Sequence, residues 1–158
     1  MSFNSKRIIV GMGVGVVMLI SYLFFALGTK APALNDVRAW ALAMLMFIGI
    51  SVLVMIVVQI LFHIAYSIGI AIQQRHQGDE KVERIISATI AEDERDKQIS
   101  LMSMRIGYRI SGFGSLLVLG VLAFGLPMVL ALHLVFGMCF LGNFVEGIAG
   151  VVYHEKGI

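Results

Sequence analysis

Charged residues are missing from three long stretches of this sequence. No aspartate, glutamate, lysine or arginine occurs within residues 8–29, 39–74 or 110–145. Such stretches would aggregate in water, whereas a helix needs about 20 apolar residues to cross the hydrocarbon core of a bilayer. With 59% hydrophobic side chains among 158 residues, the composition excludes an ordinary soluble domain. The sequence therefore predicts an integral membrane protein.

Cysteine pairs and recognisable catalytic motifs are also absent from the sequence. The single cysteine, Cys139, lies inside an apolar run, which excludes an intrachain disulfide and favours a thiol that packs as a small apolar side chain. No serine, cysteine or aspartate stands in a known motif with a general base. His63, His133 and Glu146 could be joined into a metal site, but no dense ligand motif supports that set. We therefore expect no catalytic residue, no cofactor and no metal site.

The uncharged stretches predict an all-α fold, an integral membrane four-helix bundle that forms one domain over residues 1–158. The first crossing is expected to be uncleaved, because the 22 uncharged residues after Arg7 exceed the apolar part of a signal peptide. Helix two is longer than one membrane thickness, so its end is expected to project into water. The four expected crossings are residues 8–28, 39–72, 110–124 and 128–153.

The loop after the first crossing carries signals that end one helix and begin the next. Pro32 breaks the helical pattern, and the side chain of Asn35 or Asp36 can cap the helix that follows. Trp40 then stands where an interfacial indole is favoured.

The last uncharged run is interrupted near its middle. Pro127 lacks a backbone N–H group, and Gly125 tolerates the geometry of a turn. We expect a tight helical hairpin at this place, with a single kinked helix as the alternative.

Residues 75–109 are predicted to form a cytoplasmic helical segment between helices two and three. Apolar residues recur there at spacings of three and four, and a bend can separate two amphipathic parts on either side of the charged run 92–97. The segment contains seven basic and seven acidic residues. Its net charge near zero argues against direct binding of nucleic acid.

The distribution of basic residues predicts the orientation in the membrane. Lys6 and Arg7 precede the first crossing, Lys156 follows the last one, and the central segment carries seven more basic residues. The opposite loops offer only Lys30 and Arg38. Because cytoplasmic loops are enriched in lysine and arginine, we expect a multi-pass protein of the cell inner membrane with both termini in the cytoplasm.

Glu146 is the most informative candidate for a functional residue. It follows a long uncharged run within the predicted fourth helix, with Asn143 and Gly150 on the same side. An ionised carboxylate in hydrocarbon costs at least about 2.5–3.5 kcal/mol by insertion scales. One interpretation is a position that responds to protons or ions. The other is a carboxylate near the interface that fixes the depth of the helix or pairs with a basic residue of the central segment.

Helix two carries a polar stripe of Gln59, His63 and Ser67, which are spaced by four and therefore share one face. Such side chains in lipid normally turn toward other helices and form hydrogen bonds there. The stripe is interpreted either as interhelical packing or as a relay with Glu146. On helix one, Gly11 and Gly15 form a GxxxG pair, which permits close helix contact within the chain or between copies.

Two segments resemble those of a known family. The run from Asp93 through Glu94, Arg95 and Asp96 to Ile99 resembles the DERD-x-x-I signature of small bacterial four-helix membrane proteins, the DUF2178-type proteins of unknown function. Residues 143–147 and 152–157 resemble the end of those proteins, where a membrane-embedded glutamate precedes a tyrosine-containing, basic tail. The resemblance covers the C-terminal half. It implies that Asp93, Glu94, Arg95, Asp96 and Glu146 are the positions to test.

These observations predict a non-enzymatic regulatory or sensory membrane protein. The charged central segment is its main water-exposed surface, so it is expected to dock a cytosolic protein partner through Asp93, Glu94, Arg95 and Asp96. We also expect contact with the lipid bilayer and self-association into a homo-oligomer. The alternative is a helical bundle that handles an ion or small solute, or an accessory subunit of a transporter, using Glu146 and the polar stripe of helix two.

Overall fold

The computed structural model describes residues 3–73 and 94–156, and these residues form four helices and no strand. The first half of the predicted central segment, including Asp93, lies outside the described residues. Each of the four helices is long and apolar enough to cross a membrane. The all-helical fold and the four candidate crossings expected from the sequence are therefore confirmed. The helices are α1 (Phe3–Leu27), α2 (Val37–Gln73), α4 (Glu94–Ala123) and α5 (Met128–Lys156).

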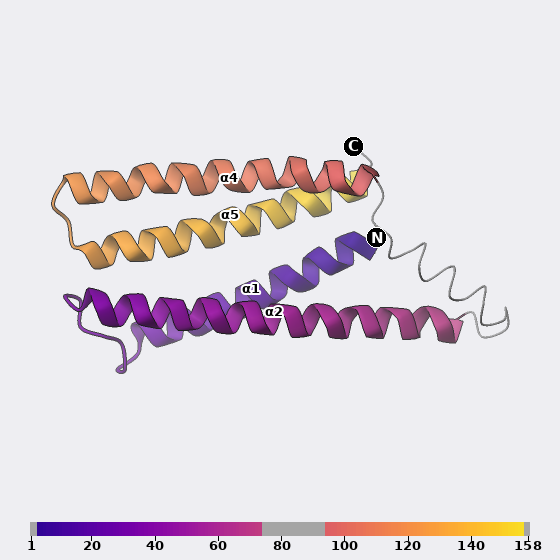
Figure 1. The fold of residues 1–158 in the computed structure, drawn as a ribbon, viewed down its shortest axis with the longest axis horizontal. Coiled ribbons are helices and arrows are strands. Elements are labelled where there is room, and N and C mark those ends of the chain that lie inside the picture. Colours follow the sequence, from indigo (N-terminus) through magenta and orange to yellow (C-terminus); the bar gives the residue numbers. More distant parts are fainter. Residues whose placement is uncertain (1–2, 74–93, 157–158) are drawn as a thin grey trace.

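The helices lie roughly along one axis (Figure 1). Helix α4 packs along α5, α5 packs on α1, and α1 crosses obliquely between α5 and α2. The start of α1, the start of α4 and the end of α5 lie at the same end of the molecule. At 37 residues, α2 is about 55 Å long, and it extends past the other helices at that end.

The loop between α1 and α2 uses the predicted cap. The backbone N–H of Ala39 donates to Oδ1 of Asp36 at 2.9 Å, so Asp36 rather than Asn35 caps α2. The indole Nε1 of Trp40 donates to the carbonyl of Ala33 at 3.1 Å. Since Trp40 is only 2% exposed, its ring fastens the loop to α2 instead of facing the lipid headgroups.

The turn between α4 and α5 has the backbone geometry of a glycine-capped helix end. Gly125 has a φ of 67°, which a side chain would disfavour. Its N–H donates to the carbonyl of Leu122, and the N–H of Leu126 donates to the carbonyl of Val121, both at 3.1 Å. Pro127 stands directly before α5, where a missing N–H group costs nothing. Two antiparallel helices leave this turn (Figure 1).

Small residues bring α4 and α5 close together. A Cβ atom at Gly142 would lie 2.5 Å from Oγ of Ser111 and 2.9 Å from the carbonyl oxygen of Gly107. A Cβ atom at Gly114 would lie 2.5 Å from Cβ of Met138. Within a membrane, helices associate through such close packing because lipid supplies no hydrophobic drive between them.

Helix α4 begins well before the crossing predicted at residues 110–124. It runs as one helix from Glu94 to Ala123, about 45 Å; the bend considered around residues 92–97 lies partly outside the described residues. Its early residues already pack inside the molecule, since Ile99 is 1% exposed and Ser103 is 3% exposed. The pairing with α5 therefore continues through the charged part of α4.

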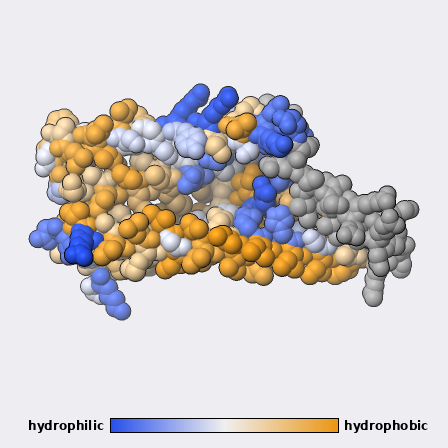
Figure 2. All heavy atoms as spheres, in the orientation of Figure 1, coloured by the Kyte–Doolittle hydropathy of each residue, from blue (hydrophilic) through white to orange (hydrophobic). Residues whose placement is uncertain are grey.

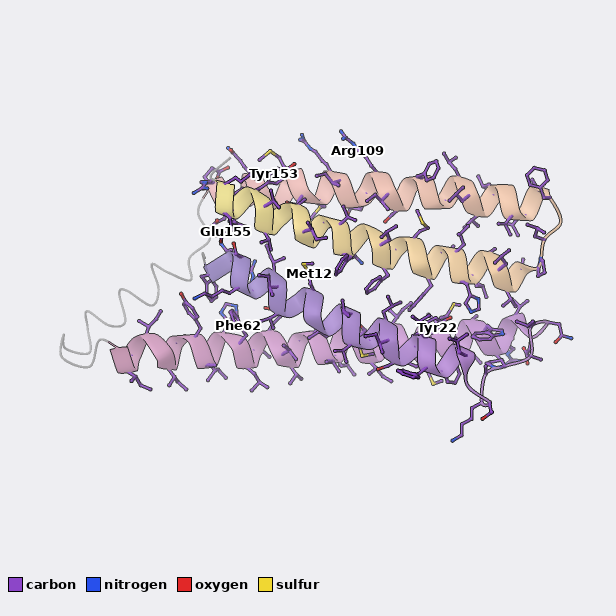
Figure 3. All side chains as sticks on the ribbon, turned by 180° about the vertical axis from the view of Figure 1, so that it is seen from behind. Met12, Tyr22, Phe62, Arg109, Tyr153 and Glu155 are labelled. Carbon is purple, nitrogen blue, oxygen red and sulfur yellow. The ribbon has the colours of Figure 1, made fainter. Side chains whose placement is uncertain are left out.

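The molecular surface separates by polarity. Hydrophobic residues dominate along α2, whereas hydrophilic residues gather at the end that carries the start of α1, along the outer edge of α4 and at the end with the α1–α2 loop (Figure 2). Arg109 points outward from α4, away from the other helices (Figure 3). A long arginine side chain near the end of a crossing can reach the headgroup region in this way.

Candidate functional site

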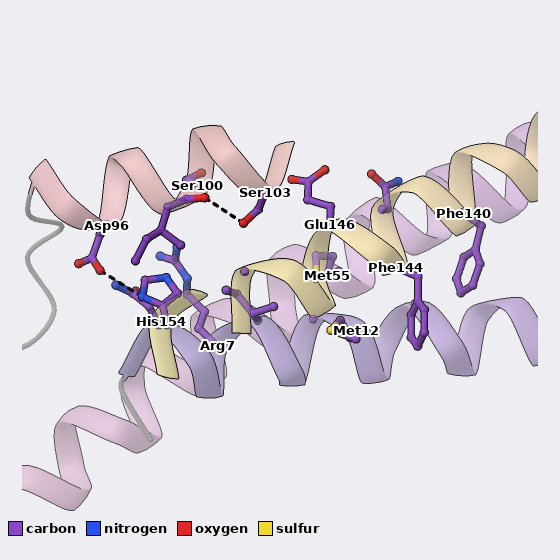
Figure 4. Close-up of a pocket in the computed structure, with 18 of the residues that line it drawn as sticks. Arg7, Met12, Met55, Asp96, Ser100, Ser103, Phe140, Phe144, Glu146 and His154 are labelled. Atoms are coloured by element: carbon purple, nitrogen blue, oxygen red, sulfur yellow. Dashed lines mark hydrogen bonds and ion pairs between the residues drawn. The ribbon is translucent and has the colours of Figure 1, made fainter. Parts of the chain in front are cut away.

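A cavity of about 380 Å³ lies between α1, α4 and α5, with part of its wall from α2 (Figure 4). We call it the charged cavity. Charged and strongly polar side chains from three helices line it, which is unusual among helices that are otherwise apolar. These side chains are Asn4, Arg7, Asp96, Asn143, Glu146 and His154.

Asp96 and His154 join the first turn of α4 to the last turns of α5. Oδ1 of Asp96 lies 3.4 Å from Nδ1 of His154, and the two side chains are 20% and 8% exposed. Because α4 and α5 are antiparallel, residues equally distant from the Gly125 turn meet, and these two residues satisfy that relation. The contact lies at the end of the charged cavity nearest the start of α4 and the end of α5.

Glu146 lies deeper along the same wall. Its Oε2 would be 2.6 Å from a Cβ atom at Gly107, so the absence of a side chain at Gly107 gives the carboxylate its place between α4 and α5. His154 is eight residues farther along α5, about 12 Å. Within the described chain, Glu146 forms no ion pair.

Arg7 brings a positive charge to the same cavity from α1. Like Glu146, it has no ion-pair partner among residues 3–73 and 94–156. Burial of a charge without a partner is costly in a low-dielectric setting. The charged cavity therefore holds one cation and one anion whose charges are available to a third group.

The wall beyond Glu146 is aromatic and apolar. The rings of Phe140 and Phe144 stack with centroids 6.0 Å apart and an interplanar angle of 15°. Met12 of α1 packs against α5, since a Cβ atom at Gly147 would lie 2.7 Å from its Cγ. Met55 completes this part of the wall from α2.

A second, larger cavity continues from this wall toward the middle of the molecule. It has a volume of about 600 Å³ and is mostly apolar, and we call it the apolar cavity. Cys139 lines it and is exposed. The two cavities meet at four residues that line both of them: Gly15, Ser51, Phe140 and Asn143.

Three of the residues singled out from the sequence meet in this site. Glu146, Asn143 and Asp96 all line the charged cavity. Glu94 and Arg95 are exposed on the neighbouring surface of α4, and Nζ of Lys97 lies 3.7 Å from Oε2 of Glu94.

The polar stripe of α2 lies elsewhere. Gln59, His63 and Ser67 do not line the charged cavity. The His63 ring stands edge-on to Phe3 with centroids 5.2 Å apart. Nε2 of Gln59 lies 3.9 Å from Sδ of Met55, while its Oε1 is buried without a hydrogen-bond partner in the described structure.

The GxxxG glycines of α1 serve contacts within the chain. A Cβ atom at Gly11 would lie 3.4 Å from Nε2 of Gln59 on α2. One at Gly15 would lie 3.5 Å from the ring of Phe140 on α5. The two glycines thus fit α1 between α2 and α5.

Sequence reasoning did not assign Arg7 or His154 to a site. The sequence pattern uses Arg7 only as an orientation signal and does not single out His154. The position of His154 could have been predicted from the hairpin. Asp96 and His154 are equally far from Gly125 in the sequence, so two antiparallel helices place them opposite each other. Nothing in the spacing indicated that Arg7 of α1 would join them.

The histidines of the described chain lie at separate places in the fold. Among the residues that the structure describes, no three His, Cys, Asp or Glu side chains come together as a metal site. His133 lies with the aromatic rings of Tyr22 and Trp40, where its ring centroid is 4.6 Å from that of Trp40. It is therefore separate from both His63 and Glu146.

Comparison with known proteins gives no relative: no family model, no curated protein and no solved structure matches this chain.

Proposed function

We propose that this chain is a non-enzymatic regulatory or sensory protein of the inner membrane. A small ligand binds in the charged cavity, and the start of α4 transmits occupancy of the cavity to a cytosolic protein partner. The resemblance of residues 93–99 to DUF2178-type membrane proteins is compatible with this role and supplies no activity of its own.

The observation that carries the proposal is the double role of the first turns of α4. Asp96 faces the charged cavity and contacts His154. Glu94, Arg95 and Lys97, within two residues of it, are exposed. A ligand that displaces Asp96 or His154 would therefore move charges that face water.

The positions of basic residues support a cytoplasmic location for this end of the molecule. Among the basic residues that the structure describes, only Lys30 and Arg38 lie at the end with the α1–α2 loop. Under the positive-inside rule, the end richer in lysine and arginine faces the cytoplasm. The described basic residues at this richer end are Lys6, Arg7, Arg95, Lys97 and Lys156, while Arg105 and Arg109 lie farther along α4.

The docking role is tested by placing a photo-crosslinking amino acid at Arg95 of the full-length protein in living cells, with the same substitution at exposed Arg38 as the matched control. We expect a discrete cytosolic protein adduct at position 95 and none at position 38. A crosslinker placed at Lys97 should capture the same partner. Reversing the two neighbouring charges with Glu94→Arg and Arg95→Glu should then reduce the yield of the adduct at Lys97 at least fivefold. An adduct that is insensitive to charge reversal would contradict the docking role.

Handling of an ion or small solute, alone or as a transporter subunit, is the second candidate function. It is favoured by the four residues that line both the charged cavity and the apolar cavity, because they place Glu146 close to a second space farther along α5. This second candidate function uses Glu146 without the polar stripe of α2, because Gln59, His63 and Ser67 do not line the charged cavity. In proteoliposomes, a transporter would show flux under a proton gradient that Glu146→Gln abolishes. Absence of flux under any gradient would dismiss this candidate.

A further inference from the structure

We propose that the ligand is a lipophilic organic cation, with its positive charge beside Glu146 and its hydrocarbon part in the apolar cavity. This inference rests on the proposed function, since it names the class of ligand for the same cavity. The charge of Glu146, the character of the surrounding wall and the four residues shared by the two cavities support it.

Glu146 supplies the charge that selects the ligand. The carboxylate is half-buried in a helix that is apolar over most of its length, and it has no ion pair with any described residue. Ionisable groups at such positions normally pair with a group of opposite charge. Arg7 lines the same cavity but does not form that pair, so a cation from outside the chain can fill the role.

The lining of the charged cavity as a whole suits an organic cation better than a metal ion, and its two phenyl rings leave α5 on the other side from the Glu146 carboxylate (Figure 4). The stacked rings of Phe140 and Phe144 and the thioethers of Met12 and Met55 line the same cavity. Aromatic faces attract alkylated cations, and thioethers adapt to apolar groups of irregular shape. A hard divalent cation instead requires several oxygen ligands, and the described residues provide no cluster of three acidic, histidine or cysteine side chains.

The apolar cavity provides room for the hydrocarbon part. Asn143 is three residues from Glu146 on α5 and lines both cavities. Volumes of about 380 and 600 Å³ fall within the range of sites that hold drug-sized molecules, roughly 300–1,000 Å³. A cation at Glu146 can therefore extend its apolar part through the junction into the apolar cavity.

The positive groups of the site lie at the other end. Arg7 and His154 line the charged cavity but not the apolar one, and Arg7 precedes the junction residue Gly15 by eight residues, about 12 Å along α1. A lipophilic cation that approaches from the apolar cavity meets Glu146 before it meets Arg7. The order of charges thus favours this ligand over a lipophilic anion, for which Glu146 would be the first and repulsive contact.

The test uses tetraphenylphosphonium and tetraphenylborate, which have nearly the same size and shape and opposite charge. Binding of each to the full-length protein in lipid nanodiscs is measured by equilibrium dialysis, with empty nanodiscs correcting for uptake into lipid. We expect saturable binding of tetraphenylphosphonium that tetraphenylborate does not match. Glu146→Gln should weaken it at least tenfold, whereas Glu94→Gln, which removes an exposed carboxylate, should leave it within twofold of wild type.

Three results would overturn the inference: no saturable binding above empty nanodiscs, equal binding by wild type and a folded Glu146→Gln protein, or equal binding of the two probes. If the crosslinker at position 95 captured no cytosolic partner while the cation still bound, only the docking role would be refuted. The two proposals can therefore fail separately.

Cys139 gives a second measurement that needs no substitution. It is the one cysteine in the sequence, and its exposed thiol lines the apolar cavity. Bound tetraphenylphosphonium should slow alkylation of Cys139 by a membrane-permeant maleimide at least fivefold, and tetraphenylborate should not. Equal alkylation rates with and without tetraphenylphosphonium would place the cation outside the apolar cavity and contradict the inference.

Discussion

The α4–α5 pair and the layer formed by α1 with its neighbours are assembled in opposite ways. Between α4 and α5, glycine and serine residues let the backbones approach so closely that a Cβ atom at Gly142 would lie 2.9 Å from the carbonyl oxygen of Gly107. Around α1, side chains rather than backbones make the contacts, either against glycines, as where Met12 packs on Gly147, or against each other, as where Tyr22 packs on Phe136 with ring centroids 4.5 Å apart. Both cavities lie in this second layer.

The contrast assigns different roles to the two parts. Backbones in such close contact fix the distance between two helices, because protein interiors tolerate little change in volume. The close α4–α5 pair therefore holds Asp96, Glu146 and His154 in one wall. The layer around α1 leaves space in front of that wall, and this space is where a ligand can bind.

The largest effect is expected from enlarging a glycine in the close pair. Gly142→Val would force its new methyl groups against Ser111 and the backbone of Gly107, and we expect a loss of about 2–3 kcal/mol in the free energy of unfolding. Gly137→Val is the matched control on the same helix, since nothing lies within 4 Å of a Cβ atom there. Reversible unfolding in mixed micelles measures both. Equal losses would show that α4 and α5 are not closely packed.

A smaller effect, an increase in the free energy of unfolding, is expected when empty space in the layer around α1 is filled. Ser51 lines both cavities, so the side chain of Ser51→Leu can fill empty space and raise the free energy of unfolding by about 0.5–1 kcal/mol. Ser111→Leu is the comparison, because Ser111 faces Gly142 in the close pair and its enlargement should destabilise. The same unfolding assay applies. Destabilisation by both substitutions would remove the distinction between the two parts.

Much of the fold could be predicted from the sequence, because charge-free length and turn chemistry are local properties. The Asp36 cap and the break around Gly125 and Pro127 follow from the residues at those positions. The start of α4 could not be placed, since charges such as Arg105 on an exposed face conceal an inner face that already pairs with α5.

The candidate site was only partly predictable. Glu146 was recognisable as a charge within an apolar helix, but a polar stripe such as that of His63 shows only that one face turns inward and not which helix it meets. Because α1 crosses between α2 and α5, His63 meets Phe3 instead of Glu146. Arg7 joins the site through the same crossing, which no local pattern encodes.

The most direct test of the account is a crystal structure grown from a lipidic mesophase with tetraphenylarsonium, whose arsenic atom gives an anomalous signal. The account predicts an anomalous peak in the charged cavity beside the Glu146 carboxylate, with phenyl density reaching past Phe140 into the apolar cavity. Arsenic peaks confined to the lipid-facing surface, with Glu146 paired to another residue of the chain, would contradict it.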